Sequence, residues 1–187
     1  PSCGKLPVSW LPTSSVCTSR RKPARYRCRC DVMTDIVDAA TRSRMMSGIR
    51  GGNTKPELHV RRMLHRQGFR FRLHVSDLPG KPDIVLPRYC AVIFVHGCFW
   101  HGHDCYLFRM PSTRRDFWQP KIGRNRENDC RAISALNSAG WRVMTVWECA
   151  LRGRKRLDDA ALTGLIDTWL RGNQPHAELA GSHEGEK

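Results

Sequence analysis

Val92–Cys105 reads VIFVHGCFWHGHDC, and both the fold and the chemistry of the chain are best approached from this stretch. It begins as an unbroken apolar run that ends at Gly97, which predicts a buried β-strand. Its last ten residues hold three histidines, two cysteines, an aspartate, a phenylalanine and a tryptophan. Polar and reactive side chains at this density are costly to leave without partners. We therefore expect the functional groups to gather at the end of this strand.

The chain has 187 residues, which is enough for one domain with a hydrophobic core. Its 32 Lys and Arg exceed its 17 Asp and Glu, so the formal net charge is +15 and the pI is near 10.1. A charge of this size predicts a polyanionic partner, most often nucleic acid; a merely soluble basic surface is the alternative. No apolar run approaches the roughly 18 residues of a membrane span, so we expect no membrane association.

The two ends of the chain differ from its middle. Residues 1–32 carry four of the nine cysteines, several prolines and an excess of basic side chains, without helical or strand periodicity. We expect them to form a basic, disordered extension, with Met33 a candidate natural start; a metal half-site in the CRC motif near its end is the less favoured alternative. Residues 33–172 are expected to form one domain, and residues 173–187 a polar, frayed C-terminal tail.

Periodicity within the domain predicts helices that alternate with strands. Asn53 to Glu57 is typical of a helix start, with a polar cap, a proline in the first turn and an acid near the positive end of the helix dipole. Apolar and polar residues alternate from Phe69 to Val75, which predicts a half-buried strand. The other expected elements are strands at 84–86, 90–95 and 143–147, an irregular basic and aromatic segment at 108–121, and helices at about 125–139 and 157–169. This order predicts a single α/β domain with a mixed central sheet flanked by helices.

Cys98, His103 and Cys105 lie close together in the sequence, and Cys149 follows a later predicted strand. Three ligands from one loop and a fourth from another element are what a closed structural zinc site requires. Disulfides are the alternative, but the lack of a secretory signal favours a reducing compartment. A zinc site would also clamp to the sheet a loop that has few aliphatic side chains. The remaining thiols of the domain, Cys90 and Cys130, are expected to be buried or half-buried.

Two histidines, His96 and His101, remain once His103 is assigned to zinc. A histidine is more often structural than catalytic, but these two flank a turn at the end of a buried strand, and an imidazole without a metal can accept a proton near neutral pH. Asp83 follows Pro82 at the start of a predicted strand, where it either hydrogen-bonds the preceding turn or holds a divalent ion. A carboxylate in this place, beside a second buried strand, is the sheet pattern of metal-dependent nucleases.

Four separated blocks resemble the very short patch repair (Vsr) DNA mismatch endonucleases: LPGKPDIV at 78–85, VIFVHGCFWHGHDCYLF at 92–108, FWQPKIGRN at 117–125 and GWRVMTVWECALRGR at 140–154. The resemblance extends from about Met33 to Gly172. It implies a restriction-endonuclease-like fold and an enzyme that recognises a T·G mismatch, formed by deamination of 5-methylcytosine, in duplex DNA. Such an enzyme uses magnesium to cut one strand 5′ to the mismatched thymine and carries a structural zinc ion.

The resemblance also implies roles for the residues of the active site. Asp83 corresponds to the magnesium-binding aspartate and His101 to the general base. Asp129 corresponds to the carboxylate that orients this histidine. Two further residues correspond to groups that support the site by hydrogen bonding and by organising water or metal, His96 and Glu57.

The zinc site and a set of aromatic residues are implied in the same way. The zinc ligands of the family correspond to Cys98, His103, Cys105 and Cys149, the set that the spacing already suggests. The aromatics that wedge into the base stack beside the mismatch correspond to Phe99, Trp100 and Trp118. Insertion beside a mismatch is physically reasonable, because a mismatched pair is easier to unstack and an aromatic ring replaces the lost stacking. Core packing is the alternative role for these rings.

The chain departs from the family pattern at several positions. Val95 stands where some relatives have threonine; this is harmless if its main-chain carbonyl is the magnesium ligand, and it should lower metal affinity if a hydroxyl is needed. Gly102 and Asp104 replace histidines that are not among the expected ligands. Phe94-Val95-His96 occupies the place of the acidic-x-lysine pattern of restriction-type nucleases, so a histidine must do what the lysine does elsewhere.

Two other classes of function remain open at this point. A zinc-stabilised DNA-binding module without catalysis would explain the charge and the zinc ligands, but it leaves Asp83, His96 and His101 without a task. A nuclease of other specificity would explain Asp83 but not the wedge aromatics. For the favoured function we expect duplex DNA with a T·G mismatch as the partner, other mismatch-repair proteins as further candidates, a monomer, and a cytoplasmic, nucleoid-associated location in a bacterium.

Overall fold

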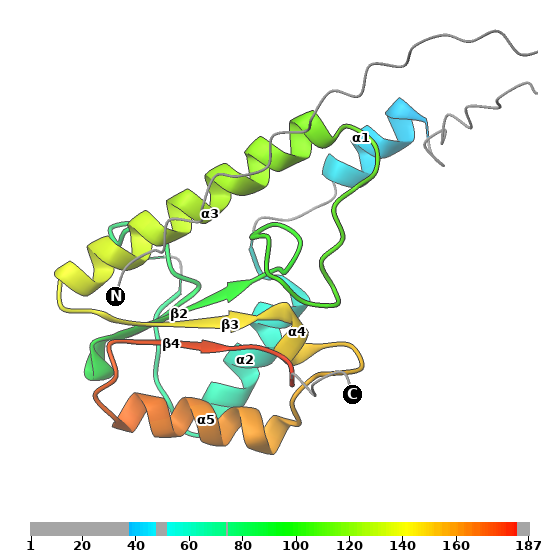
Figure 1. Cartoon of the computed structure of the whole chain (residues 1–187). Helices are drawn as coiled ribbons and strands as arrows, with labels where there is room; N and C mark the ends of the chain where they lie inside the picture. Colours follow the sequence, from blue (N-terminus) through cyan, green and yellow to red (C-terminus); the bar gives the residue numbers. More distant parts are fainter. Residues whose placement is uncertain (1–37, 48–51, 74, 183–187) are drawn as a thin grey trace, which may run out of the picture.

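The computed structural model describes residues 38–47, 52–73 and 75–182 (Figure 1). The elements in chain order are α1 (Ala39–Ser47), α2 (Lys55–Arg66), β1 (Ile84–Leu86), the 3₁₀ turn η1 (Pro87–Tyr89), β2 (Ala91–His96), α3 (Arg115–Ser138), β3 (Arg142–Trp147), α4 (Glu148–Leu151), α5 (Asp159–Arg171) and β4 (His176–Leu179). None of the helices in these ranges combines the length and the apolar character that crossing a membrane requires. The expectations for residues 1–32 and their CRC motif lie outside the described residues.

The strands form one four-stranded sheet in the order β1-β2-β3-β4. β1 runs antiparallel to β2, with Val85 opposite Val92. β2, β3 and β4 are parallel, with Val92 beside Val143 and Val143 beside His176. α3 covers one face of the sheet, and α2 and α5 cover the other (Figure 1). This arrangement confirms the predicted single α/β domain with a mixed sheet and flanking helices.

Side chains of the central strands alternate between the two faces of the sheet, as the strand period of two requires. On one face, Ile93 and Met144 join a cluster with α2 and α5 side chains such as Leu64. On the other face, Val92 and Leu136 belong to a smaller cluster beneath α3. The whole apolar run that precedes His96 is buried, as expected of a strand covered on both faces.

The start of α2 follows the predicted pattern and brings an acid to the site. The Thr54 hydroxyl accepts a hydrogen bond from the Glu57 N–H, and Pro56 lies in the first turn. Gly68 follows the helix with a φ of +82°, a left-handed conformation that ends the helix. The cap therefore holds Glu57 at the amino end of α2, facing the sheet.

The predicted strand from Phe69 to Val75 is wrong. Phe69 is buried in the cluster of α2 and α5, and of the described residues in this segment only Arg72 pairs with the sheet, in an isolated antiparallel bridge to Val85. His74, the last residue but one of the predicted strand, lies outside the described residues. Alternation is not sufficient for a strand, because a strand also needs a partner over several residues, and β1 is only three residues long.

Two further boundaries differ from expectation. α3 begins at Arg115 instead of near residue 125, so the second half of the segment predicted to be irregular is helical. Pro120 lies inside this helix, and a proline there suggests a break because it removes a backbone donor. The frayed C-terminal tail is wrong for His176–Leu179, which pair with β3 as an edge strand of alternating exposure.

Arg142 joins the start of β3 to the end of α5. Its guanidinium donates hydrogen bonds of 2.8–3.1 Å to the carbonyl oxygens of Tyr89, Trp169, Leu170 and Gly172. It also lies 4.9 Å from the centroid of the Trp169 ring. The last carbonyls of a helix have no partners inside the helix and carry partial negative charge, so the half-buried guanidinium of Arg142 stabilises them.

We predict that Arg142→Met lowers the free energy of unfolding by about 2–4 kcal/mol, because several carbonyls lose a charged donor. Urea denaturation followed by circular dichroism measures this change. Arg171→Met is the matched control, since Arg171 lies at the same end of α5 but pairs with Asp167 on the surface. It should change stability by less than about 0.5 kcal/mol. Equal losses in the two variants would contradict the capping role.

Candidate active site and metal centre

A cavity of about 740 Å³ lies at the carboxyl end of β2, between this strand, α2, α3 and α4. It is the meeting point of residues far apart in the sequence, since Glu57 and Asp129 both line it. All five residues expected to be catalytic contribute to its wall: Asp83, His101, His96, Glu57 and Asp129. Two of the three expected wedge aromatics line it as well, Phe99 and Trp100. The fold thus brings the predicted site together in one place.

Asp83 precedes β1 and is held against the neighbouring strand. Its Oδ2 accepts a 2.7 Å hydrogen bond from the Val95 N–H, which leaves Oδ1 for another partner. Burial raises the pKa of Asp83 to about 6, and the nearby Glu57 carboxylate acts in the same direction. The Val95 side chain packs in the cluster of α2 and α5, so only the main chain of this residue is available to Asp83.

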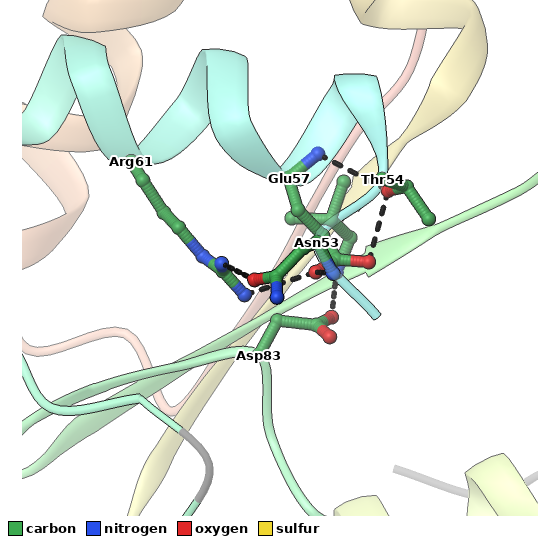
Figure 2. Close-up of polar contacts among 6 residues, drawn as sticks. Asn53, Thr54, Glu57, Arg61 and Asp83 are labelled. Atoms are coloured by element: carbon green, nitrogen blue, oxygen red, sulfur yellow. Dashed lines mark hydrogen bonds and ion pairs between the residues drawn. The ribbon is translucent and has the colours of Figure 1, made fainter. Parts of the chain in front are cut away.

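Glu57 is buried together with an arginine that neutralises it (Figure 2). Its carboxylate accepts hydrogen bonds from the Asn53 N–H at 2.8 Å, the Thr54 hydroxyl at 2.9 Å and the Arg61 guanidinium at 2.9 Å. Glu57 is 4% exposed and Arg61 is 7% exposed. A buried carboxylate with three donors, one of them charged, is fixed in orientation. Figure 2 shows this group next to Asp83.

His101 and His96 form the opposite side of the site. The Nδ1 atom of His101 is 2.6 Å from Oδ2 of Asp129 on α3, so Nε2 is the ring nitrogen left to face a substrate. The His96 ring stacks on the His101 ring, with centroids 3.8 Å apart and planes 4° from parallel. Burial lowers the pKa of His96 to about 4, and the positive charge of a protonated His101 acts in the same direction. His96 is therefore neutral at physiological pH.

Cys98, His103, Cys105 and Cys149 converge as the spacing predicts. One possible ligand atom from each lies within 4.8 Å of every other. The His103 Nδ1 atom is 3.7 Å from the Cys98 sulfur and 3.6 Å from the Cys149 sulfur. Tetrahedral zinc, with bonds of about 2.3 Å to sulfur and 2.0–2.1 Å to nitrogen, would place such atoms roughly 3.6 Å apart. These residues could therefore hold a metal ion, and their geometry fits zinc.

The C-terminal segment completes this metal centre. The Gly181 N–H donates to the Cys149 sulfur at 3.3 Å, and a Cβ at Gly181 would lie 2.6 Å from the Cys149 carbonyl oxygen. A hydrogen bond from the Cys98 side chain lowers the pKa of the Cys149 thiol to about 5, and the Gly181 N–H contributes to this shift. Hydrogen bonds to a ligand sulfur stabilise the thiolate that a metal requires.

Comparison with known proteins places the chain in a family. Residues 34–107 match the family of the DNA mismatch endonuclease Vsr. The DNA mismatch endonuclease Vsr of Escherichia coli K12 is 50% identical over 147 residues, which cover 79% of this chain and 94% of that protein. The chain belongs to the Vsr family. The type II nicking enzyme V.XorIIP of Xanthomonas oryzae is also similar, at 49% identity over 72% of this chain and 98% of its own. V.NmeAIP, a type II nicking enzyme of Neisseria meningitidis, is 45% identical over a region that covers 65% of this chain and 87% of that protein.

The aromatic residues expected from the Vsr family form a cluster at the edge of the cavity. The Phe99 ring centroid lies 5.2 Å from those of Trp100 and Trp118, and the two tryptophans are 5.9 Å apart. Trp118 comes from the first turns of α3, not from an irregular segment. The Asn125 side chain donates to the Trp100 carbonyl at 2.8 Å and so ties the loop to α3. All three rings are half-buried, which leaves part of each open to a partner.

Sequence reasoning missed several residues of the site. Arg61 follows Glu57 by four residues on the same helix face, a spacing that could have identified the ion pair. Lys81 also lines the cavity. Its φ is +50°, a left-handed backbone conformation that residues other than glycine rarely adopt. Glu148, next to Cys149 of the cysteine and histidine cluster, also lines the cavity. The expectation that Cys90 and Cys130 are buried or half-buried is wrong, because both are exposed.

We predict that the protein as purified contains one zinc ion per chain and that Cys149→Ser lowers this content and the melting temperature together. The sulfur of Cys149 is replaced by a weaker zinc ligand, and the loop that contains Cys98 loses its connection to α4. Atomic absorption and thermal denaturation measure the two effects. Cys90→Ser is the control, because Cys90 is exposed and outside the cluster, and it should keep the full zinc content. Zinc content unchanged in Cys149→Ser would rule out this ligand set.

We predict that Asp83→Asn makes the protein more stable by about 1–3 kcal/mol at pH 7.5 without added magnesium. Because the pKa of Asp83 rises to about 6 on folding, the ionised carboxylate opposes folding as pH rises from 3.8 through 6. The advantage of asparagine should therefore fall to roughly half at pH 5. Urea denaturation at both pH values measures it. Asp77→Asn, at an exposed turn, should change stability by less than about 0.5 kcal/mol at either pH. If Asp83→Asn proves less stable than the parent at pH 7.5, this account is wrong.

Proposed function

We propose that this protein is a magnesium-dependent DNA endonuclease that nicks one strand of a duplex at a T·G mismatch, 5′ to the mismatched thymine. Its membership of the Vsr family and its similarity to nicking enzymes support a DNA nicking endonuclease. The observation that carries the proposal is one cavity in which a His101–Asp129 pair faces the carboxylate of Asp83. A base and a metal-binding acid in one cavity are the two groups that phosphodiester hydrolysis needs.

Asp83 and the main-chain carbonyl of Val95 would hold the magnesium ion. The Asp83 Oδ1 atom has no hydrogen bond among the described residues, and carboxylate and carbonyl oxygens are ligands that magnesium prefers. When bound, the ion would polarise the phosphate and lower the pKa of a coordinated water. The Glu57 carboxylate, fixed by Arg61, lies close enough to raise the pKa of Asp83, and it would accept hydrogen bonds from water around the ion.

His101 would accept the proton of the attacking water at Nε2. Asp129 holds Nδ1 in its protonated form and stabilises the charge that develops on the ring. The neutral His96 ring packs against His101 over its whole face and so restricts its rotation. This pair of histidines would replace the lysine of restriction-type nucleases. A restriction-endonuclease-like core is part of the proposal, supported by an acid before β1 and histidine chemistry at the end of the adjacent strand β2.

Phe99, Trp100 and Trp118 would supply specificity for the mismatch. Their rings form one wedge beside the catalytic groups, and each is partly open. A T·G pair is easier to unstack than a matched pair, and stacking on an aromatic ring contributes about 1–3 kcal/mol per base. The zinc centre would hold this wedge in place, because Phe99 and Trp100 follow the ligand Cys98 directly. Duplex DNA is the proposed partner, other mismatch-repair proteins are further candidates, and one protomer carries a complete site for cutting one strand.

A strand-specific nicking assay tests this function. Duplexes identical except for T·G or T·A at one position carry a different fluorescent label on each strand, and each is incubated with magnesium or with EDTA. We expect one cut, 5′ to the thymine, in the T·G duplex with magnesium alone. Equal cutting of both duplexes would support a DNA nicking endonuclease but would contradict its specificity for the T·G mismatch. Tight binding without cutting would favour the zinc-stabilised binding module.

Asp83→Asn distinguishes catalysis from binding in the same assay. The substitution keeps the size of the side chain and an oxygen for the Val95 N–H, but it removes the charge that holds the metal. Cutting should fall by about a hundredfold or more, while the affinity for the T·G duplex stays within a few-fold. Loss of binding in parallel with cutting would point to a folding defect, which the zinc content of the variant would reveal.

A further inference from the structure

Arg152 lies at the edge of the active-site cavity, and neither the magnesium ligands nor the general base depends on it. Its Nε atom is 2.7 Å from Oε1 of Glu148, and both residues line the cavity that contains Asp83 and His101. The Arg152 side chain is 64% exposed, whereas that of Glu148 is 17% exposed. The guanidinium is thus held by a half-buried carboxylate while most of its surface stays open to a partner.

Glu148 also holds the turn that leads from β2 into the zinc-ligand loop. Its Oε2 accepts a 3.1 Å hydrogen bond from the Cys98 N–H. The approach is close, since a Cβ at Gly97 would lie 3.8 Å from this oxygen and 3.3 Å from the Trp100 ring. One carboxylate therefore sets the position of Arg152 relative to the loop that carries the zinc ligands and the wedge.

The backbone of Arg152 is fixed as well. Its N–H donates to the Glu148 carbonyl at 3.0 Å, and its own carbonyl accepts a 2.9 Å hydrogen bond from the Tyr106 hydroxyl. A surface ion pair that stabilises a helix is the simpler explanation of the Glu148–Arg152 contact. This explanation fits poorly here, because α4 spans only Glu148–Leu151 and Arg152 follows it in an extended conformation.

We propose that Arg152, oriented by Glu148, binds a phosphate of the DNA strand that enters the cavity, next to the phosphate that is cut. Because Nε faces Glu148, both Nη nitrogens remain for a phosphate. A guanidinium can bind two oxygens of one phosphate at once, through two parallel hydrogen bonds. Arg152 is then a binding residue and Glu148 a positioning residue. This inference rests on the proposed DNA nicking function and extends it to a specific contact on the strand.

The salt dependence of DNA binding tests the contact directly. The affinity of the full chain for a labelled T·G duplex is measured by fluorescence anisotropy without magnesium, at KCl concentrations from about 50 to 200 mM. Removing one phosphate contact lowers the slope of log affinity against log salt by about 0.9. We expect Arg152→Ala to lower the slope by this amount and to weaken binding to T·G and T·A duplexes alike, since a phosphate carries no sequence information.

Two more variants separate a phosphate contact from a structural role. Arg152→Lys should restore the slope but not the full kcat/KM for nicking, because an ammonium group cannot pair with Glu148 and two phosphate oxygens at once. Glu148→Gln keeps an acceptor for the Cys98 N–H, so zinc content should stay at one per chain while KM rises and kcat changes little. Loss of zinc in Glu148→Gln would instead show that its carboxylate serves the metal centre, and would overturn its positioning role.

Arg171→Ala is the matched control for charge, because Arg171 is equally exposed and pairs with Asp167 on α5. Its slope should equal that of the parent. The proposal fails if Arg152→Ala leaves the slope unchanged, or if Arg171→Ala lowers it by the same amount. The two proposals can fail separately. If the parent protein binds duplex DNA but does not cut at a T·G mismatch, the proposed function is refuted. A lower slope in Arg152→Ala would in that case still support the phosphate contact.

Discussion

The convergence of Cys98, His103, Cys105 and Cys149 is the interaction on which the geometry of the site depends. The loop after β2 has few aliphatic side chains, so apolar packing contributes less to its fold than it does to the strands. Three of its side chains, Cys98, His103 and Cys105, meet Cys149 in α4, the short helix that follows β3. His101 lies between two of these ligands in the sequence, so the same convergence decides how the ring reaches Asp129. A metal ion held by this cluster would therefore help to position His101, the proposed general base.

The second constraint on the site is the negative charge of two neighbouring carboxylates beside β1. Asp83 and Glu57 lie together in a region that burial makes unfavourable for both, and the raised pKa of Asp83 shows the cost. Arg61 is buried with them and compensates one of the two negative charges. A chain selected for stability alone would avoid this grouping. Its presence is understandable if the remaining negative charge is balanced by a cation during the reaction.

Local patterns predicted what local interactions decide. The apolar run from Val92 to Val95 is a buried strand, the cap at Thr54 starts α2, and the four cysteine and histidine residues predicted from their spacing converge. Failures occurred where the outcome depends on distant partners. The alternation after Phe69 lacks a strand long enough to pair with, and polar His176–Leu179 become a strand because β3 offers a free edge. Asp129 could not be found by spacing at all, since its contact with His101 depends on how α3 crosses the sheet; the family resemblance supplied it.

The link from Gly181 to the Cys149 sulfur has a consequence for the order in which the protein is made. Cys98 is the first residue of the cluster, whereas Gly181, whose N–H contacts the Cys149 sulfur, comes more than eighty residues later, beyond β4. The surroundings of the Cys149 sulfur are therefore complete only once the segment beyond β4 has been synthesised and has packed beside α4. A chain that ended before Gly181 would contain all four Cys and His residues of the cluster and would lack this hydrogen bond.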